Sequence, residues 1–512
     1  MITDNLYIDD EARGRLISGI KKAAKAVGAT MGTGGSNAII EAIENPGHLT
    51  TNDGATILGA IHFADPIEEM GRKILLESVS RANKQSGDGS STTTVLTAAI
   101  IEEGIKYTKD HSPMAIKRSL EECVPVLEAA IKANSQDITV DDVAKVATIS
   151  AEDESIGKLI QEIYSQIGAD GIIHWDISKT TEDTYTIGSG ITMEGAGAVS
   201  PYMFDLDEKT GNFTQSVRWS HPKVMIVRQK ITSAADFNAL FASLDSNQQR
   251  EVVIFCDEIE PTVVADLIRT RAVRGFKTVV VKMPVLWKDQ WYEDLAQATG
   301  AKIIDPALGL SITTAKQEDL GTVANMVITK DDTFMDGIRD LTDHIASIKE
   351  QGTDEAELRA SRLNTRTARL FIGAASDSAL SYKRLKVEDA ISAAWQSLHG
   401  GIVPGGGVAM VNASKSLSTS IGSIILAHAL RAPAQQIAAN AGVEADWSKY
   451  TATHGLDSRS GQYVDMVESN IVNPTNVEVN AIKNAVSVAA AVLTASTVVT
   501  LPRDDAHYPT PA

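Results

Sequence analysis

Cysteine is nearly absent from this chain of 512 residues, which contains only Cys123 and Cys256. Both lie in apolar stretches, where a buried free thiol is the expected state. This usage favours a reducing compartment over a disulfide-stapled secreted fold. Basic residues are also in the minority, because 47 Lys and Arg stand against 66 Asp and Glu and leave a net charge of −19. Such a chain repels phosphate backbones, so we expect no nucleic-acid partner.

Signals for export or membrane insertion are weak. The N-terminus lacks the basic start and apolar core of a secretory signal, so we expect a cytoplasmic protein. Residues 485–502 carry no charge, but their many Ala, Ser and Thr residues make them weakly hydrophobic for their length. We predict a buried helix there and expect no membrane partner.

Several common catalytic and cofactor motifs are missing. The ten histidines have no metal-ligand spacing with one another or with the cysteines, which argues against a zinc or iron site. There is no Gly-x-Ser-x-Gly elbow. Two glycine clusters, at 30–37 and 400–408, match neither the Walker pattern nor the dinucleotide fingerprint. A nucleotide, if bound, is therefore held by another kind of cradle.

The pattern along the chain favours a central α/β domain inserted into a discontinuous helical one. Apolar residues at helical spacing near both ends predict helices over 70–80, 92–107, 114–134, 424–441 (interrupted at Pro433) and 477–496. In the middle, β-branched runs at 224–227, 252–255, 278–281 and 302–304 alternate with helical segments, which predicts a partly parallel sheet. Residues 352–366 look like an exposed charged helix.

The sharpest motif spans residues 87–96, where two glycines and five consecutive hydroxyl residues precede an apolar run. Glycines let the backbone approach a ligand, and a helix N-terminus offers free N–H groups and a positive dipole end to phosphate. Asp88 between the glycines can hold Mg²⁺. The alternative is a glycine turn with an N-cap, but that needs only one or two hydroxyls. We therefore predict a phosphate site.

For Asp53, for Asp389 and for a set of apolar residues in the middle of the chain, the sequence leaves both a structural and a functional interpretation open. Asp53 precedes a glycine and would ordinarily be a turn residue, while Asp389 lies in a Glu-Asp pair that would ordinarily be a solvated helix face. Either could instead act as general base or water positioner in phosphoryl transfer. In the middle domain, several apolar side chains are either helix core or an exposed protein-binding surface: Tyr202, Met203, Phe204, Phe237, Leu240, Phe241, Val264, Leu267 and Ile268.

Four motifs in a fixed order carry a family resemblance. Residues 51–54 read Thr-x-Asp-Gly, residues 87–96 carry the phosphate motif, residues 387–390 read Val-Glu-Asp-Ala, and residues 405–409 read Gly-Gly-Gly-Val-Ala. The chain from about Tyr7 to Pro502 resembles a group I (GroEL-like) chaperonin subunit in all four, with Ser90 and Ser91 in place of two of the family's threonines. It is identified as a divergent member.

The resemblance implies a multidomain α and α/β fold with three domains. The helical equatorial domain would comprise 1–134 and 400–512, the α/β intermediate hinge 135–189 and 368–399, and the α/β apical domain 190–367. The resemblance also implies a homo-oligomeric ring that captures unfolded polypeptide and promotes its folding in a cavity, driven by ATP hydrolysis. ATP and Mg²⁺ are the implied cofactors, with K⁺ as a candidate second ion and a co-chaperonin lid as a candidate partner.

Site residues follow from the resemblance, motif by motif. The nucleotide set is Thr30, Met31, Gly32, Thr33, Asn52, Asp88, Gly89, Ser90, Ser91, Thr92, Gly406, Asp457, Ser458 and Asn473. Asp88 would hold Mg²⁺, Asp389 would position the attacking water, and Asp53 would assist at the γ-phosphate. The polypeptide-binding set is Tyr202, Phe204, Phe237, Leu240, Phe241, Val264, Leu267 and Ile268.

The nucleotide set also departs from the family pattern. Asn52 replaces a lysine, Asn473 replaces a ribose-side aspartate, and Asp457-Ser458 stand where the family has a base-side Asn-Ala pair. Two functions stay open on these grounds: an ATP-hydrolysing chaperonin, and a passive holdase or structural ring with a degraded nucleotide site. Retention of Asp53, Asp88 and Asp389 favours the first.

Overall fold

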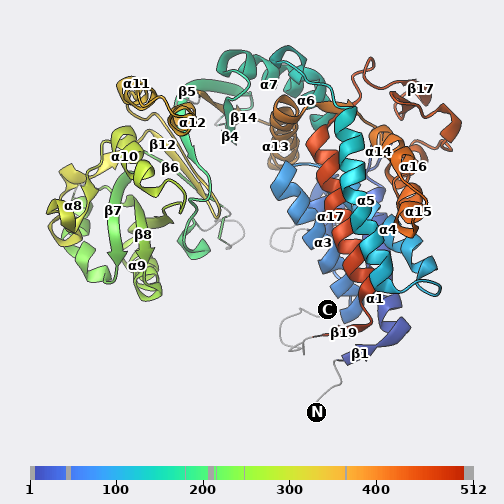
Figure 1. Cartoon of the computed structure of the whole chain (residues 1–512). Coiled ribbons are helices and arrows are strands. Elements are labelled where there is room, and N and C mark those ends of the chain that lie inside the picture. The colour runs from blue at the N-terminus through green and yellow to red at the C-terminus, as the bar shows by residue number, and fades with distance from the viewer. Residues whose placement is uncertain are drawn as a thin grey trace. The chain divides into compact units, whose positions relative to one another are not determined.

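The computed structural model describes residues 6–41, 48–178, 180–205, 213–214, 216–246, 248–363 and 366–500. The chain divides into two compact units (Figure 1). Unit 1 comprises Met1–Ala169, Trp175–Thr184 and Phe371–Ala512, and unit 2 comprises Asp170–His174 and Tyr185–Leu370. Both chain ends thus belong to one unit and the middle forms the other. This division does not test the expected intermediate domain, which stays a prediction.

Unit 1 is mainly helical. Its helices are α1 (Asp9–Gly28), α2 (Gly54–Ala60), α3 (Pro66–Ser86), α4 (Ser90–Gly104), α5 (Pro113–Ala133), α6 (Val143–Ala151), α7 (Glu154–Ile167), α13 (Asp377–Gly400), α14 (Val408–Ala413), α15 (Ile421–Ala429), α16 (Ala432–Asn440) and α17 (Thr475–Thr494). The helices expected in this part of the chain are all present. Pro433 lies in the first turn of α16, which confirms the expected interruption there.

Short strand pairs connect these helices. They are β1 (Leu6–Ile8) with β19 (Thr497–Val499), β2 (Ala38–Glu41) with β3 (His48–Thr51), β15 (Ile402–Pro404) with β18 (Val472–Pro474), and β16 (His454–Asp457) with β17 (Gln462–Asp465), all antiparallel. The first pair joins residues from the two ends of the chain. The pair β15 and β18 brings the glycine cluster that follows α13 beside the start of α17, although these two segments are far apart in the sequence.

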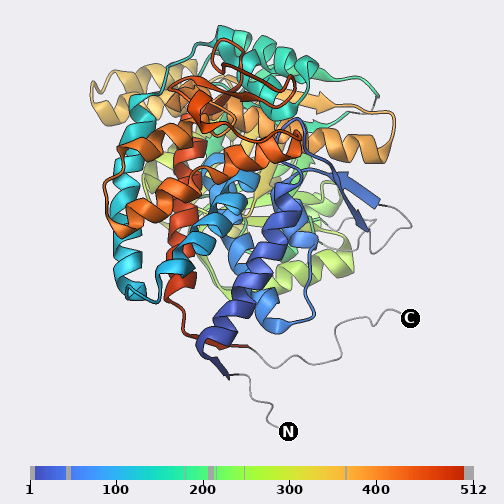
Figure 2. The ribbon, with the colours of Figure 1, turned by 90° about the vertical axis from the view of Figure 1, so that its right-hand side faces the viewer.

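The two chain ends share one hydrophobic core. Helix α17 packs against α3, α4 and α5, so the red C-terminal helix runs among helices from the first quarter of the chain (Figures 1 and 2). Among the described residues, α17 is the helix long and apolar enough to cross a membrane, with a mean hydropathy of 1.2, yet 72% of that window is buried. The buried-helix prediction for residues 485–502 is right as far as Thr494, after which β19 follows, and residues 501–502 lie outside the described residues.

Unit 2 is an α/β unit that contains most of two sheets. The larger sheet has the order β4-β14-β5-β13-β12-β6, and the other has the order β10-β7-β8-β9 with β11 beside β7. Their bounds are β4 (Ile172–Ile177), β5 (Thr184–Met193), β6 (Ser216–Ser220), β7 (Lys223–Ile231), β8 (Glu251–Ile259), β9 (Lys277–Lys282), β10 (Ile303–Ile304), β11 (Gly321–Thr322), β12 (Asn325–Thr329), β13 (Thr333–Asp336) and β14 (Arg366–Ile372). Strands β10, β7, β8 and β9 pair in parallel, which confirms the predicted sheet.

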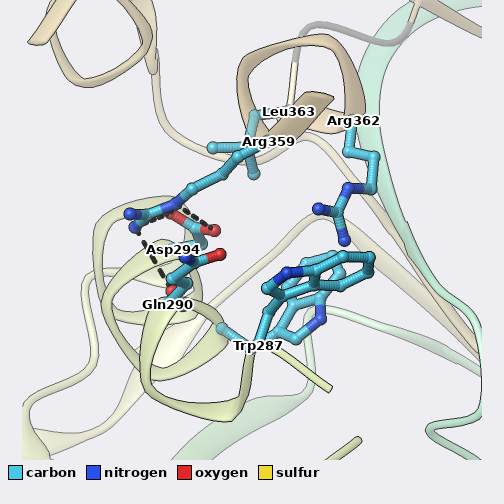
Figure 3. Close-up of a pocket in the computed structure, with 7 residues that line it drawn as sticks. Trp287, Gln290, Asp294, Arg359, Arg362 and Leu363 are labelled. Carbon is cyan, nitrogen blue, oxygen red and sulfur yellow. Dashed lines mark hydrogen bonds and ion pairs between the residues drawn. The ribbon is translucent and has the colours of Figure 1, made fainter. Parts of the chain in front are cut away.

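The helices of unit 2 are α8 (Asn238–Ser246), α9 (Pro261–Arg274), α10 (Lys288–Thr299), α11 (Thr342–Lys349) and α12 (Asp354–Leu363). Helix α9 packs against β9, and α10 packs against β7 of the parallel sheet. The expectation of an exposed charged helix at 352–366 is wrong for α12, because Ala360 and Leu363 are buried in the unit core. Its arginines are also engaged: Arg359 is buried against Asp294 of α10 at 2.7 Å, and Arg362 lies over the Trp287 ring (Figure 3). Charged residues therefore hold this helix in place.

Most of the apolar set proposed to bind polypeptide is core. Five of its side chains are buried, namely Phe204, Phe237, Leu240, Phe241 and Leu267. Val264 and Ile268 are partly buried and pack against the same cluster. Tyr202 alone of the set is well exposed, at 59%, with its ring edge-on to Phe213. The expectation of an exposed groove is therefore wrong for the five buried residues, because their side chains pack into the hydrophobic core of unit 2.

Candidate functional site

One cavity of about 820 Å³ in unit 1 is lined by every residue of the expected nucleotide and catalytic sets. A volume of roughly 300–1,000 Å³ is typical of small-molecule and cofactor sites. The lining residues come from loops and helix ends spread over more than 400 positions, from Thr30 to Glu478. The fold thus gathers the separate sequence motifs around one space.

The phosphate motif forms a tight loop between α3 and α4. Both Gly87 and Gly89 have positive φ, at 65° and 91°, a conformation that glycine adopts without strain. Helix α4 begins at Ser90 without a side-chain cap, so its first N–H groups are free for an anion. Ser90, Ser91 and Thr92 line the cavity, whereas Thr93 and Thr94 are buried in the helix. Three of the five hydroxyl residues are therefore available to a ligand.

Asp53 combines the two alternatives left open by the sequence. It is the N-cap of α2, where its carboxylate accepts a 2.7 Å hydrogen bond from the Thr56 N–H. The same carboxylate accepts a 3.2 Å hydrogen bond from the Ser90 hydroxyl of the phosphate loop. Asp53 is thus a capping residue that also lines the cavity beside the first turn of α4.

Helix α13 brings Asp389 to the same place. Asp389 is half-buried and lines the cavity, while the neighbouring Glu388 is exposed, so only one member of the Glu-Asp pair faces the site. One turn earlier, Lys386 is buried and pairs with Glu152 at 3.0 Å. One turn later, the Ser392 hydroxyl donates to the carbonyl oxygen of Ser86 at 2.9 Å. Residues three apart share a helix face, so this face of α13 meets the phosphate loop.

The carboxylates at this end of the cavity repel one another. Burial, opposed in part by the hydrogen bonds from Gly89 and Ser150 and by the charge of Lys386, raises the pKa of Asp88. Burial also raises the pKa of Asp389 well above its usual value, and the charges of Asp88 and Asp53 add to that rise. Such a site gains most from a cation that neutralises several carboxylates at once.

The chemistry of this donor set fits Mg²⁺ together with a phosphate chain. Within the described ranges, no group of three or more His, Cys, Asp and Glu side chains is arranged to hold a metal ion unaided. Mg²⁺ usually takes one or two carboxylates and completes its shell with water and substrate phosphates. Asp88 can supply that small number of protein ligands together with Asp53, whose charge raises the pKa of Asp88, and with Asp389, whose pKa the charge of Asp88 raises.

The opposite end of the cavity is more apolar. Met31, Ile437, Leu456 and Met466 line it beside Gly406. A Cβ atom on Gly406 would lie 2.6 Å from the Met466 Cε, so glycine keeps this part of the pocket open. An apolar slot of this kind suits a flat ring such as a nucleobase.

Hydrogen bonds fix the positions of the polar residues at the apolar end of the cavity. The Thr33 and Ser458 hydroxyls are 2.7 Å apart and link the loop after α1 to the loop between β16 and β17. The Asp457 carboxylate accepts hydrogen bonds from the Arg459 N–H at 2.9 Å and the Ser460 hydroxyl at 2.6 Å. These contacts fix the shape of the loop that borders the apolar slot.

Asn473 lies between the two ends and has an unexpected partner. Its side-chain amide donates to Glu478 Oε1 at 2.5 Å. Glu478 is 2% exposed, its Oε2 has no hydrogen-bond partner, and its side chain lines the cavity. Burial raises the pKa of Glu478 to about 7, although the Asn473 hydrogen bond opposes the rise.

Sequence reasoning missed several polar residues that line the cavity, among them Ser150, Glu152, Lys386 and Glu478. Lys386 could have been found from its position one helical turn before Asp389. Ser150 and Glu152 lie together at the end of α6, and Glu152 also accepts a 3.0 Å hydrogen bond from Asn52. Glu478 stands between Val477 and Val479. An acidic residue that interrupts an apolar run in this way was the signal in the sequence that could have identified it as a site residue.

Comparison with known proteins agrees with this architecture. The chain is similar in structure to the chaperonin gp146 from the bacteriophage EL 2 (Pseudomonas aeruginosa), solved in the presence of ATP-BeFx. Crystal form II matches with a TM-score of 0.71 and crystal form I with 0.65, each at 17% identity over 97% of this chain and 99% of that chain. At this identity the likeness establishes the fold, which confirms the predicted multidomain α and α/β chaperonin architecture.

A family model gives the second comparison. The model described as the TCP-1/cpn60 chaperonin family matches residues 23–181 and 212–502. The match includes the phosphate loop, the Asp389 helix and the start of α17, so the cavity is built almost entirely from matched segments. Because the match extends over most of the sequence, the chain belongs to the TCP-1/cpn60 chaperonin family.

Proposed function

We propose that this protein is an ATP-hydrolysing chaperonin subunit whose nucleotide site is the cavity of unit 1. One observation carries the proposal: Asp53, Asp88 and Asp389, distant in sequence, line the same cavity as the uncapped N-terminus of α4. Phosphoryl transfer needs positioning and charge neutralisation around a phosphate chain, and this end of the cavity supplies both kinds of group.

Each residue has a defined part in the proposed reaction. The N–H groups and hydroxyls at the start of α4 bind phosphate oxygens, and Asp88 would hold the cation. Mg²⁺ would neutralise charge that develops on the phosphates. Asp389 accepts a hydrogen bond from a water molecule and directs its oxygen at the γ-phosphorus. The new O–P bond forms as the bond to the bridging oxygen breaks, ADP leaves, and the water proton passes to Asp389 or to the released phosphate.

The raised pKa of Asp389 supports a reaction in which metal and nucleotide bind before the carboxylate accepts a proton. Burial and neighbouring carboxylate charges raise the pKa of Asp389 and so favour its protonated form. Asp389 would favour its carboxylate form if Asp88 held a cation, because a nearby positive charge favours the carboxylate. Asp389 would thus become a competent proton acceptor when metal and nucleotide are present, which limits unproductive chemistry in the empty site.

The test is Mg²⁺-dependent ATP turnover by the full chain beside its Asp389→Ala variant. We expect the wild type to hydrolyse ATP and the variant to bind it with turnover lowered at least 100-fold, since general-base and positioning groups contribute roughly that much. If the wild type binds ATP but does not hydrolyse it, the passive holdase becomes the better description. If the variant retains full turnover, the role of Asp389 is wrong.

Capture of unfolded polypeptide is the second half of the proposal and rests on family membership. The exposed Tyr202 and Phe213 pair in unit 2 supports a contact surface there, because exposed aromatic side chains commonly mark binding sites. We further propose a homo-oligomeric ring, a separate lid protein as partner and a cytoplasmic location. The two free cysteines, both buried, are in keeping with a reducing compartment.

A further inference from the structure

Helix α17 carries a row of three asparagines along one face. Asn476, Asn480 and Asn484 stand four residues apart, so their side chains share a face of the helix. Asparagine is a weak helix former, because its short amide competes with the backbone for hydrogen bonds. Most of α17 is buried, and amides in such surroundings need partners from other elements. The asparagine row therefore indicates specific contacts with the neighbouring helices.

Two members of the row bind the end of α3. The Asn480 amide donates to the Ser86 hydroxyl at 3.1 Å, and the Asn484 amide donates to Gln85 Oε1 at 2.9 Å. Gln85 and Ser86 are the last two residues of α3, directly before the phosphate loop. The row thus holds α17 against the residues from which the loop starts.

The third member reaches α13 through Gln396. The Asn476 amide donates to Gln396 Oε1 at 3.3 Å, and Gln396 Nε2 donates to the backbone carbonyl of Gln85 at 3.2 Å. The Gln396 side chain is buried, so these two hydrogen bonds lie away from bulk water. Gln396 follows Asp389 by seven residues and therefore lies on the same face of α13, together with Ser392. One amide side chain thus joins the three helices α3, α13 and α17.

Hydrogen bonds of this kind fix the relative position of helices better than apolar contacts do. Apolar side chains can repack after a small shift, whereas a buried amide loses its partner when the helices slide. A single buried asparagine sets the register of paired helices in coiled coils for this reason, at a cost in stability. Position matters for α13, because Asp389 is proposed to direct a water molecule at a phosphorus atom. A misplacement of about 1 Å at such a group can cost as much as 100-fold in rate.

We propose that Gln396 is a positioning residue for ATP hydrolysis, which holds α13 against α3 and α17 so that Asp389 faces the phosphate loop. The inference rests on the proposed ATPase function and adds a residue that lies outside the cavity. Its effect passes through Asp389. Loss of Gln396 therefore slows the chemical step, while the phosphate loop and the apolar slot still bind the nucleotide.

The test is Gln396→Met in the full chain, because methionine keeps the length of the side chain and removes both hydrogen bonds. We expect kcat for ATP to fall about 10-fold. ADP affinity with Mg²⁺, measured by calorimetry, should stay within about twofold of the wild type, since a positioning defect acts on the reaction and not on ground-state binding.

Asn476→Ala removes the partner of Gln396 on α17 and leaves α13 unchanged. It should lower kcat by about threefold or more, and the double variant should be no slower than Gln396→Met alone, because the two side chains act as a unit. Thermal unfolding checks that each variant is folded. Should Gln396→Met fail to fold, the same comparison of kcat with ADP affinity in Asn476→Ala decides the inference.

Gln161→Met is the matched control. Gln161 on α7 also donates to a backbone carbonyl, that of Asp141 at 2.6 Å, and lies outside the cavity. Its kcat should stay within about twofold of the wild type. An unchanged kcat in Gln396→Met, an equal loss of kcat and ADP affinity, or an equal loss of kcat in Gln161→Met overturns the inference and leaves the proposed function intact. Absence of ATP turnover by the wild type overturns both.

Discussion

Ser392, one turn beyond Asp389 on α13, donates a 2.9 Å hydrogen bond to the carbonyl oxygen of Ser86, the last residue of α3 before the phosphate loop. The next residue, Gly87, leaves room for this contact, because a Cβ atom there would lie 1.8 Å from the Ser392 hydroxyl oxygen. The helix that carries the proposed catalytic carboxylate is thus attached directly to the loop proposed to bind phosphate.

Gly87→Ala should therefore lower ATP turnover by separating α13 from the loop. We expect kcat to fall at least 10-fold, because a displacement of about 1 Å at a reacting group can cost as much as 100-fold. Steady-state turnover beside ATP affinity is the measurement. Gly168→Ala is the control, since Gly168 also has a positive φ, of 83°, but a Cβ atom there meets no atom within 4 Å. Equal losses in the two variants would assign the effect to backbone strain alone.

The charge of Lys386 should set the pH at which the protein becomes active. Burial and neighbouring carboxylates raise the pKa of Asp389, and Lys386 lowers it. Asp389 is protonated below its pKa, so turnover should decline as the pH falls. Lys386→Met removes the opposing charge and should move the acidic limb of the kcat profile to higher pH by about one unit.

Lys383→Met provides the control for that shift. Lys383 lies one turn before Lys386 on α13 and pairs with Asp183 at 2.6 Å, without lining the cavity. Its loss removes an ion pair from the same helix, so the acidic limb should stay in place. An unchanged profile in Lys386→Met would show that this lysine does not act on the base.

Glu478 should make the empty protein less stable as the pH rises. Burial raises its pKa from 4.5 to about 7 in the folded state. A raised pKa adds stability that is complete below the unfolded value and is lost as the pH rises through the folded value. Relative to Glu478→Gln, the wild type should lose up to about 3 kcal/mol of unfolding free energy between pH 5 and pH 8.

Urea unfolding of both proteins without nucleotide, at several pH values, measures this difference. Glu128→Gln is a useful comparison, because hydrogen bonds from Lys132 and Lys483 lower the pKa of Glu128 and give its contribution the opposite sign. Parallel stability curves for wild type and Glu478→Gln would contradict the buried, proton-binding state of Glu478.

In unit 2, mutation of the buried apolar set should affect stability more than client capture. Phe237 is fully buried and stacks on Phe241, so Phe237→Ser should cost about 3–5 kcal/mol. Tyr202→Ser, at an exposed position, should change stability by less than about 0.5 kcal/mol and reduce capture of denatured protein. Thermal unfolding and a light-scattering capture assay separate the two effects. Normal capture by Tyr202→Ser would remove Tyr202 from the client surface.

The sequence pattern predicted many of the strands and helices because the signals for these elements lie within a few adjacent residues. The β-branched runs at 224–227 and 252–255 became paired parallel strands, and Pro433 ended one helix and began another. The phosphate loop was predictable because glycine at positive φ and hydroxyl residues at a helix start have few other uses. The members of the nucleotide set came from matched motifs, and all of them line one cavity.

Burial and pairing could not be predicted in the same way. An apolar run such as 237–241 has the same periodicity whether its face meets a sheet or solvent, so the burial of Phe237 depended on how the 3₁₀ turn Ala234–Phe237 and the following helix α8 pack in the core. Thr93 and Thr94 continue the hydroxyl run, yet the first turn of α4 directs them into the core. Side-chain direction at a helix end depends on the whole packed structure.

The kinds of chemical group at the site, a glycine-rich phosphate loop and several carboxylates, are properties of short segments and could be recognised without a structure. Their convergence, the attachment of α13 at Ser86 and the burial of Glu478 in the cavity wall depend on contacts between segments more than 400 positions apart. The preference of a short segment for a glycine turn or a helix start depends only on a few adjacent residues. Long-range contacts form only when the hydrophobic core brings distant segments together, and burial then sets the charge state of the carboxylates.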